Sequence, residues 1–192
     1  MDKRQRILAT AEALLAERGL YGLSMKLLAD TAGIAAGTIY RYFENKDTLI
    51  KELYQHVTQE NADTIFKGWS DKQTPEDKYK LLWRNAFDAT LKKTQRLAVI
   101  EMLFSQPDLA QEQAALCEDS AFSPLVDFYQ QGIDKGHFHN WQIASLIALS
   151  FDSAINLAKK IVRKRLSVDE IQINQVRDAS WLIIQKDFNI NN

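Results

Sequence analysis

The sequence predicts an all-α protein in which a small N-terminal three-helix unit precedes a larger helical region. Apolar residues recur at helical spacing along most of the chain, helix-capping sequences separate these stretches, and no segment shows the alternation of a strand. The 192 residues include only three prolines and seven glycines, and 46% of them are hydrophobic. Such a composition is typical of a globular, helix-rich protein with a substantial core.

The first predicted helix covers residues 3–18 and ends at Gly19, because glycine readily adopts the left-handed conformation that closes a helix. Its apolar stripe consists of Ile7, Leu8, Ala11, Leu14 and Leu15. Tyr21, Leu23 and Met25 are expected to close a small core over this stripe.

Two short helices joined by a tight turn are predicted for residues 24–46. Ser24 is a good N-cap for the first of them, and Gly33 can end it in the left-handed conformation. The second helix buries Ile39 and Phe43, which are four residues apart, and therefore presents its polar side chains outward.

This arrangement is typical of the helix-turn-helix, whose second helix enters the DNA major groove by its N-terminal end. Ala35, Ala36 and Gly37 are small enough for that end to approach a duplex closely, with its amides facing phosphate. A purely structural helical corner is the alternative interpretation, because any compact three-helix core needs small residues at such a crossing.

Three motifs carry a resemblance to a known family: residues 32–34 (AGI), 37–43 (GTIYRYF) and 45–49 (NKDTL). They resemble the TetR/AcrR family of bacterial transcriptional regulators, closely over the first 50 residues and only in length and helical pattern beyond. The resemblance implies a homodimeric repressor that a small-molecule ligand releases from its DNA operator. It suggests efflux or stress genes as the targets.

Carried over position by position, the resemblance implies phosphate contacts from Ser24, Tyr40 and Lys46. It places nearest the base edges the residues Lys26, Ala36, Gly37, Thr38 and Tyr42. The Lys26 ammonium can reach O6 and N7 of guanine. Because the second helix carries few long base-reading side chains, DNA shape and backbone contacts are expected to provide much of the specificity. A solvated surface lysine is the alternative reading of Lys46.

Further helices are predicted for residues 46–67, 75–93, 95–106, 109–117, 123–135, 140–164 and 168–188. Asn45, Thr74 and Ser167 are the capping residues expected to open three of them. The predicted division is a DNA-binding domain of residues 1–46 and a ligand-binding and dimerisation domain of residues 47–192.

The helices predicted for residues 140–164 and 168–188 are apolar nearly all round, so each must be covered on more than one side. A subunit interface would cover them, and an internal core in a monomer is the alternative. The resemblance implies a four-helix bundle in which the last two helices pair with those of a second subunit. The operator is then expected to be pseudo-palindromic.

Aromatic residues are frequent in the larger region, and a few polar groups interrupt its apolar helices. A small-molecule site combines such groups. The candidate ligand contacts are Trp69, Trp83, Phe87, Glu101, Phe104, Phe128, Phe151, Asp152 and Asn156. Core packing explains the aromatic residues equally well, and helix or dimer contacts explain Asp152 and Asn156.

Several other functions are not favoured. His137 and His139 lack the Cys or carboxylate partners of a metal site, and no motif of an enzyme is present, so neither catalysis nor a cofactor is expected. The net charge of −1 is not the basic excess typical of DNA-binding proteins, but affinity depends on where the cations lie. A helical ligand-binding or adaptor module that does not bind DNA is therefore the rival hypothesis.

The expected location is the cytoplasm. Cys117 is the single cysteine, so it cannot form an internal disulfide, and no signal segment is seen before the first amphipathic helix. The most apolar stretch, residues 141–162, contains charged residues and is a poor membrane span.

Overall fold

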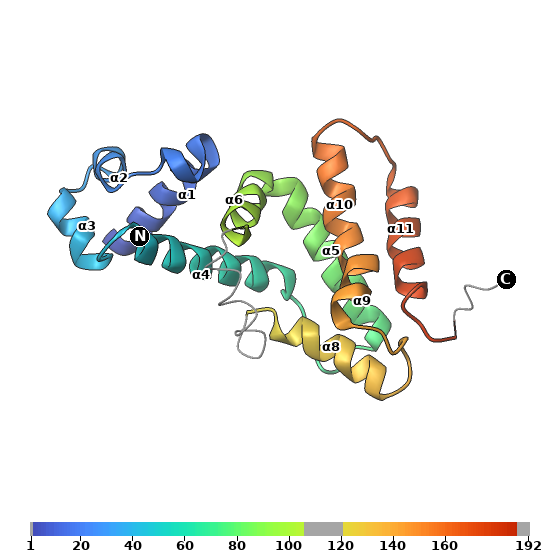
Figure 1. Ribbon diagram of the computed structural model, residues 1–192. Coiled ribbons are helices and arrows are strands. Elements are labelled where there is room, and N and C mark those ends of the chain that lie inside the picture. The colour runs from blue at the N-terminus through green and yellow to red at the C-terminus, as the bar shows by residue number, and fades with distance from the viewer. Residues whose placement is uncertain (1, 106–120, 188–192) are drawn as a thin grey trace. The chain divides into compact units, whose positions relative to one another are not determined.

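A computed structural model describes residues 2–105 and 121–187, and the regular elements in these two ranges are helices (Figure 1). An isolated antiparallel bridge joins Phe138 and Gln185, and no strand is present among the described residues. The predicted all-α class is therefore confirmed. The short helix predicted for residues 109–117, and Cys117 with it, lies outside the described residues.

In chain order the helices are α1 (Lys3–Gly22), α2 (Met25–Ala32), α3 (Ala36–Tyr42), α4 (Lys46–Ile65), α5 (Pro75–Lys92), α6 (Thr94–Phe104), α8 (Ser123–Asp134), α9 (Ile143–Leu149), α10 (Phe151–Val162) and α11 (Glu170–Leu182). The contacts divide them into two compact units. The first comprises α1, α2, α3, the part of α4 up to Glu60, and α6 from Gln95. The second comprises the end of α4 with α5, α8, α9, α10 and α11.

The helix ends expected from local sequence are confirmed at several positions. The Ser24 hydroxyl accepts a hydrogen bond from the amide of Leu27 at 3.1 Å, and Gly33 has φ 61° at the end of α2. Asn45 and Thr74 cap α4 and α5 in the same way, because their side-chain oxygens accept amide hydrogen bonds of 2.8 and 3.1 Å.

The end of α1 differs from the prediction. Gly19 does adopt a left-handed φ of 70°, but the chain resumes a helical course and α1 runs on to Gly22. Tyr21 was expected in the core and is instead fully exposed, because the turn at Gly19 directs Leu20 inward in its place. Leu23 is buried as expected.

The single helix predicted for residues 140–164 is broken into α9 and α10. The break falls at Ser150, whose φ of −114° and ψ of −77° depart from helical values. Its buried hydroxyl donates to the carbonyl of Leu146 at 2.6 Å and shares a 2.7 Å hydrogen bond with the hydroxyl of Tyr129. Side-chain hydrogen bonds thus stabilise an interruption that hydrophobic periodicity could not reveal.

The last helix is also shorter than predicted, since α11 begins at Glu170 and ends at Leu182. Its N-cap is Asp169, whose carboxylate accepts from the amide of Gln172 at 2.8 Å, and not Ser167. Asp169 competes better for this position because a carboxylate also interacts favourably with the helix dipole.

The first unit is built on one apolar core to which each of its helices contributes. The side chains that are at most 2% exposed are Ile7, Leu8, Ala11, Leu15, Leu23, Leu28, Ile39, Phe43, Leu49, Leu53, Val57, Val99 and Leu103. Val99 and Leu103 come from α6, which follows α5 in the chain. The two helices of the candidate DNA-binding motif, α2 and α3, therefore share their core with α6, which comes much later in the chain.

Arg96 on α6 adds a polar link inside the first unit. Its guanidinium donates to both carboxylate oxygens of Glu12 on α1, at 2.6 and 2.8 Å, and to the carboxylate of Glu60 on α4 at 2.5 Å. The forked geometry of arginine suits such a two-oxygen contact. The pKa of Arg96 is raised, first by its hydrogen bond to Glu12, so the charge is well held.

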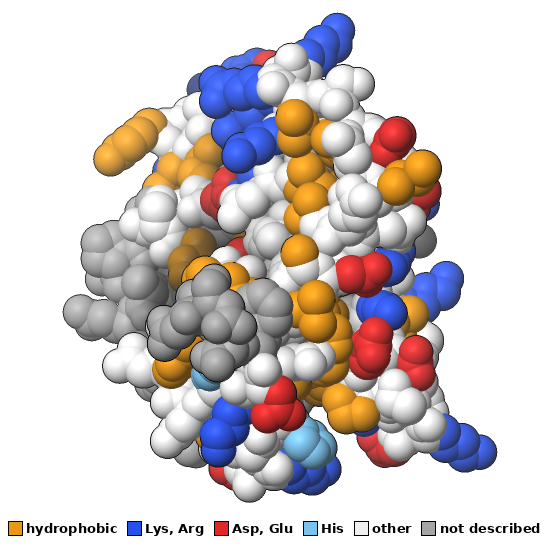
Figure 2. Space-filling model, turned by 90° about the vertical axis from the view of Figure 1, so that its right-hand side faces the viewer, with side chains coloured by type: hydrophobic (Ala, Val, Ile, Leu, Met, Phe, Trp, Pro, Cys, Tyr) orange, Lys and Arg blue, Asp and Glu red, His pale blue; other side chains and the backbone are white. Residues whose placement is uncertain are grey.

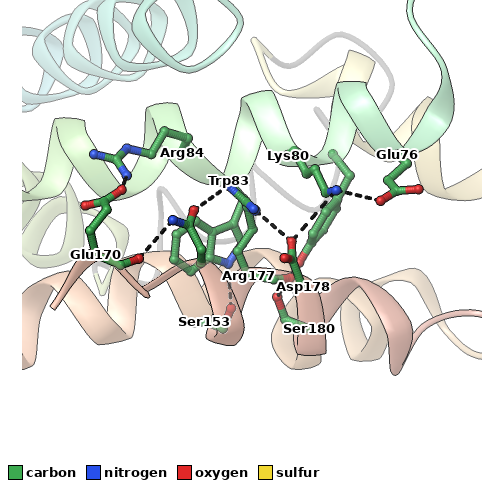
Figure 3. Close-up of polar contacts among 11 residues, drawn as sticks. Glu76, Lys80, Trp83, Arg84, Ser153, Glu170, Arg177, Asp178 and Ser180 are labelled. Atoms are coloured by element: carbon green, nitrogen blue, oxygen red, sulfur yellow. Dashed lines mark hydrogen bonds and ion pairs between the residues drawn. The ribbon is translucent and has the colours of Figure 1, made fainter. Parts of the chain in front are cut away.

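In the second unit α5, α10 and α11 pack against one another around an aromatic core. Figure 3 shows polar side chains that connect α5 to α11 beside Trp83, including an ion pair of Arg84 with Glu170 and one of Lys80 with Asp178. Beneath them the indole N–H of Trp83 donates to the Ser153 hydroxyl at 2.8 Å. The indole N–H of the fully buried Trp83 thus has the hydrogen-bond partner that a buried donor requires.

Gly132 in α8 is predicted to tolerate no larger side chain. A Cβ there would lie 2.1 Å from the ring of Phe138, whose burial closes the turn after the helix. Gly132→Ala should lower the free energy of unfolding by about 1 to 3 kcal/mol, measured by chemical denaturation. Gly37→Ala is the matched control, because no heavy atom lies within 4 Å of its added Cβ. Equal stability of the two variants would contradict this packing.

Candidate nucleic-acid interface

Two buried side chains fix the orientation of α3. Ile39 and Phe43, four residues apart, are both 0% exposed and pack into the core of the first unit. The opposite side of the helix is open to solvent, with Tyr40 53% and Tyr42 37% exposed and Arg41 exposed between them. The helix therefore presents two phenol hydroxyls and a guanidinium, all hydrogen-bond donors, to solvent.

The turn between α2 and α3 brings the two helices together. Gly33 ends α2 in the left-handed region, and the next amide, that of Ile34, returns to the carbonyl of Ala29 at 3.1 Å. Ala29 is small and 4% exposed, which allows this close approach. The geometry is that of a helix-turn-helix, as predicted, with α3 in the place of the groove-entering helix.

The predicted DNA contacts lie at the surface of this unit. Exposed residues among them are Ser24 and Lys26 on the α2 side and Ala36, Gly37, Tyr40 and Tyr42 on α3. Thr38 is half-buried. The small Ala36 and Gly37 leave the N-terminal turn of α3 unobstructed, since no heavy atom lies within 4 Å of a Cβ built on Gly37.

Lys46 occupies a more defined position than a solvated lysine. Its ammonium donates a hydrogen bond of 2.9 Å to the backbone carbonyl of Leu20, and its side chain is partly buried. An ammonium has three donors, so two remain for other acceptors such as a phosphate. Lys46 thereby holds the end of α1 against the start of α4 while keeping its charge at the surface.

Sequence reasoning missed two arginines of α1. Arg6 reaches the turn, since its Nη2 lies 3.2 Å from a Cβ built on Gly33. Arg4 forms an ion pair with Glu52 and lies over the ring of Phe43, 5.8 Å from its centroid. The only signal in the sequence was their place on the polar side of the first helix, which does not tell a DNA contact from a solvated charge.

Comparison with known proteins decides the family. The profile described as "Bacterial regulatory proteins, tetR family" matches residues 7–53, and the one described as "Tetracyclin repressor-like, C-terminal domain" matches residues 75–185. The second match alone spans more than half of the chain. The chain belongs to the TetR family.

Three similar proteins illustrate the relationship. A TetR-family transcriptional regulator from Vibrio parahaemolyticus has a solved structure with a TM-score of 0.84 and 31% identity, covering 96% of this chain and 99% of that one. An uncharacterized HTH-type transcriptional regulator from Haemophilus influenzae is 28% identical and covers 96% of this chain and 97% of its own. The HTH-type transcriptional repressor KstR2 of Mycobacterium tuberculosis is 28% identical over 71% of this chain and 70% of its own.

The protein is therefore a TetR-family transcriptional regulator with an N-terminal DNA-binding helix-turn-helix. The relatives are named as transcriptional regulators. No helix in the described ranges is long and apolar enough to cross a membrane.

Five of the candidate ligand contacts of this regulator come together in the second unit. Trp69, Trp83, Phe87, Phe128 and Phe151 all belong to, or pack against, its aromatic core. Trp83 is 0% exposed and stacks on Phe87 with ring centroids 5.4 Å apart. With its indole N–H already bonded, Trp83 acts as a core residue in this conformation. Trp69 is half-buried and meets Phe128 edge-on at 6.0 Å.

The remaining candidate ligand contacts lie on two helices, α10 and α6. Asp152 on α10 is half-buried, and this burial raises the pKa of its carboxyl, an effect that the charge of Lys159 opposes. Asn156, one turn on, is exposed. Glu101 and Phe104 lie on α6 in the first unit, where Phe104 is 53% exposed and contacts Tyr54.

His137 and His139 flank Phe138 in the turn after α8. The ring of His139 stacks on Trp141 with centroids 4.3 Å apart. Among the described residues, no group of three or more histidine, cysteine or acidic side chains is placed to hold a metal ion.

Two lysines of the DNA-binding unit should respond differently to alanine. Lys46→Ala should weaken binding to every sequence and reduce the slope of log K against log salt by about 1 for each lysine that contacts a phosphate. Lys26→Ala should instead relax preference at one base pair of each half-site, by roughly 1 to 3 kcal/mol. Fluorescence anisotropy with a salt series and a panel of operator variants measures both effects.

Lys92→Ala is the control for these variants, because Lys92 is exposed at the end of α5 in the other unit. It should leave affinity, salt slope and base preference unchanged. A specificity profile of Lys26→Ala identical to that of the wild type would contradict its base-reading role.

Proposed function

We propose that this TetR-family regulator is a homodimeric repressor that a small molecule releases from a pseudo-palindromic operator. The observation that carries the proposal is the open polar side of α3, held outward by the buried Ile39 and Phe43. The relative KstR2, named a transcriptional repressor, supports repression over activation. In this proposal residues 1–46 bind DNA, while residues 47–192 bind the ligand and a second subunit.

Exposed apolar side chains support a dimer through the last two helices. Figure 2 views the side of the molecule on which α10 and α11 lie, and apolar side chains form a band down this face. Leu149, Val162, Ile171 and Leu182 are 45, 38, 68 and 44% exposed. Covering such residues in a self-complementary contact would stabilise a two-fold dimer.

The second unit offers an aromatic surface and a carboxylate for a ligand. Trp69 and Phe128 contact each other at the margin of its core, and Asp152 lies next to the buried Phe151 on α10. An apolar site with a few polar groups suits an organic molecule, and the carboxylate favours a cationic one. Regulation of efflux or stress genes is compatible with such a ligand.

Helix α4 provides a route from ligand to DNA. Its start carries Lys46, while Ile65 at its end belongs to the aromatic core of the second unit. A ligand that favours a displaced end of this helix would shift its start as well. Operator DNA should then weaken ligand binding by the same factor by which the ligand weakens DNA binding.

Dimerisation through α11 is tested by Leu182→Arg. A charge placed in an apolar interface lacks a partner and costs several kcal/mol, so the variant should be monomeric. Analytical ultracentrifugation at micromolar concentration measures the state. Phe104→Arg, an exposed apolar position of the first unit, is the control and should remain dimeric. A wild type that is monomeric, or a dimeric Leu182→Arg, would refute this interface.

The complete proposal is tested with the DNA upstream of the coding sequence. The purified protein should shift this DNA in a gel, and a screen of apolar and cationic molecules should find some that quench tryptophan fluorescence and also abolish the shift. Binding of a cationic ligand should weaken as the pH falls through the raised pKa of Asp152, because its carboxylate then becomes protonated.

Asp152→Asn should remove this pH dependence while leaving the gel shift intact, and a neutral ligand should show none in either protein. Ligands that bind tightly without changing DNA affinity would rule out the proposed switch.

A further inference from the structure

Tyr21 is an unusual surface residue of the first unit. Its side chain is 102% exposed, the highest value among the large apolar side chains of the described residues, and the next is Ile171 at 68%. Burying a tyrosine ring would stabilise the fold through its large apolar area. A ring held wholly in water makes no such contribution, so core packing does not explain it.

The short segment that carries Tyr21 is fixed on both sides. Gly19 turns the chain with a φ of 70°, and Leu20 packs against the core. Gly22 lies tightly against the end of α1, since a Cβ there would be 2.5 Å from the Cβ of Arg18. Leu23 follows at 2% exposure. Tyr21 is thus projected from a constrained turn.

The hydrogen bond of Lys46 connects this turn to the DNA-binding surface. The carbonyl of Leu20 accepts from the Lys46 ammonium at 2.9 Å and from the amide of Leu23 at 3.4 Å. Since neighbouring Cα atoms are about 3.8 Å apart, the backbone of Tyr21 lies directly beside that ammonium. Ser24, the N-cap of α2, follows three residues later. Tyr21 is therefore adjacent to the Lys46 ammonium and three residues before Ser24, both of which are proposed to bind phosphate.

We propose that the phenol hydroxyl of Tyr21 donates a hydrogen bond to a DNA phosphate next to the one that Lys46 contacts. The inference rests on the proposed DNA-binding surface. Tyrosine is among the side chains that bind DNA phosphates, and such contacts fix register without reading sequence. A neutral donor releases no counterion, so its contribution does not change the salt dependence of binding. Lys46 then has two roles, as a charge and as the residue that positions the Tyr21 turn.

The test compares Tyr21→Phe, which removes only the hydroxyl, with the wild-type protein on a labelled duplex of arbitrary sequence and on the upstream DNA. Anisotropy should show binding weakened by about 3- to 10-fold for each lost hydrogen bond, on both duplexes. The slope of log K against log salt should be unchanged, which distinguishes a neutral donor from a lysine. Tyr21→Ala should bind no better than Tyr21→Phe, and thermal unfolding should be unaltered.

Tyr54→Phe is the matched control, because it removes a tyrosine hydroxyl from α4 of the same unit at a half-buried position. It should leave DNA affinity unchanged. If the wild type binds DNA and both Tyr21 variants bind equally well, the inference is overturned while the proposed function stands. Loss of affinity in Tyr21→Ala alone would also overturn the hydroxyl contact. Failure of the wild type to bind any duplex would overturn both proposals.

Discussion

The insertion of Ile39 and Phe43 into the core of the first unit is the contact on which the DNA-binding surface depends. A seven-residue helix is too short to be stable alone, so α3 exists because these two side chains hold it. Their spacing of four residues selects which side of the helix faces solvent. Removing the ring of Phe43 would cost about 3 to 5 kcal/mol and would release the polar side of α3 from its fixed orientation.

The core that receives these two residues extends beyond the helix-turn-helix. Val99 and Leu103 of α6 complete it, and Arg96 joins α6 to α1 and α4 through two carboxylates. Because only Lys93 separates α5 from α6, the chain leads directly from the aromatic unit into the DNA-binding unit. Helix α4 also passes from one unit into the other, between Glu60 and Asn61, so the chain joins the two units at both of these places.

Local sequence predicted the parts of the fold that depend on local interactions. Ser24 begins α2 and Gly33 ends it through contacts within a few residues, so both roles could be predicted from the sequence. The break at Ser150 was not, because it depends on the hydroxyl of Tyr129, and neither was the contact of Arg96 with Glu12 across 84 residues. The proposed DNA contacts rest mainly on the family resemblance, since spacing alone does not separate a phosphate-binding lysine from a solvated one.

Hydrogen–deuterium exchange with and without operator DNA most directly tests whether the open side of α3 binds the duplex. At saturating DNA, exchange should slow in residues 24–46, which include both helices of the motif and the start of α4. At lower DNA concentrations the slowing should scale with the bound fraction. Unchanged exchange throughout this segment, in a sample whose DNA is shown to be bound, would contradict the assignment of α3 as the DNA-contacting helix.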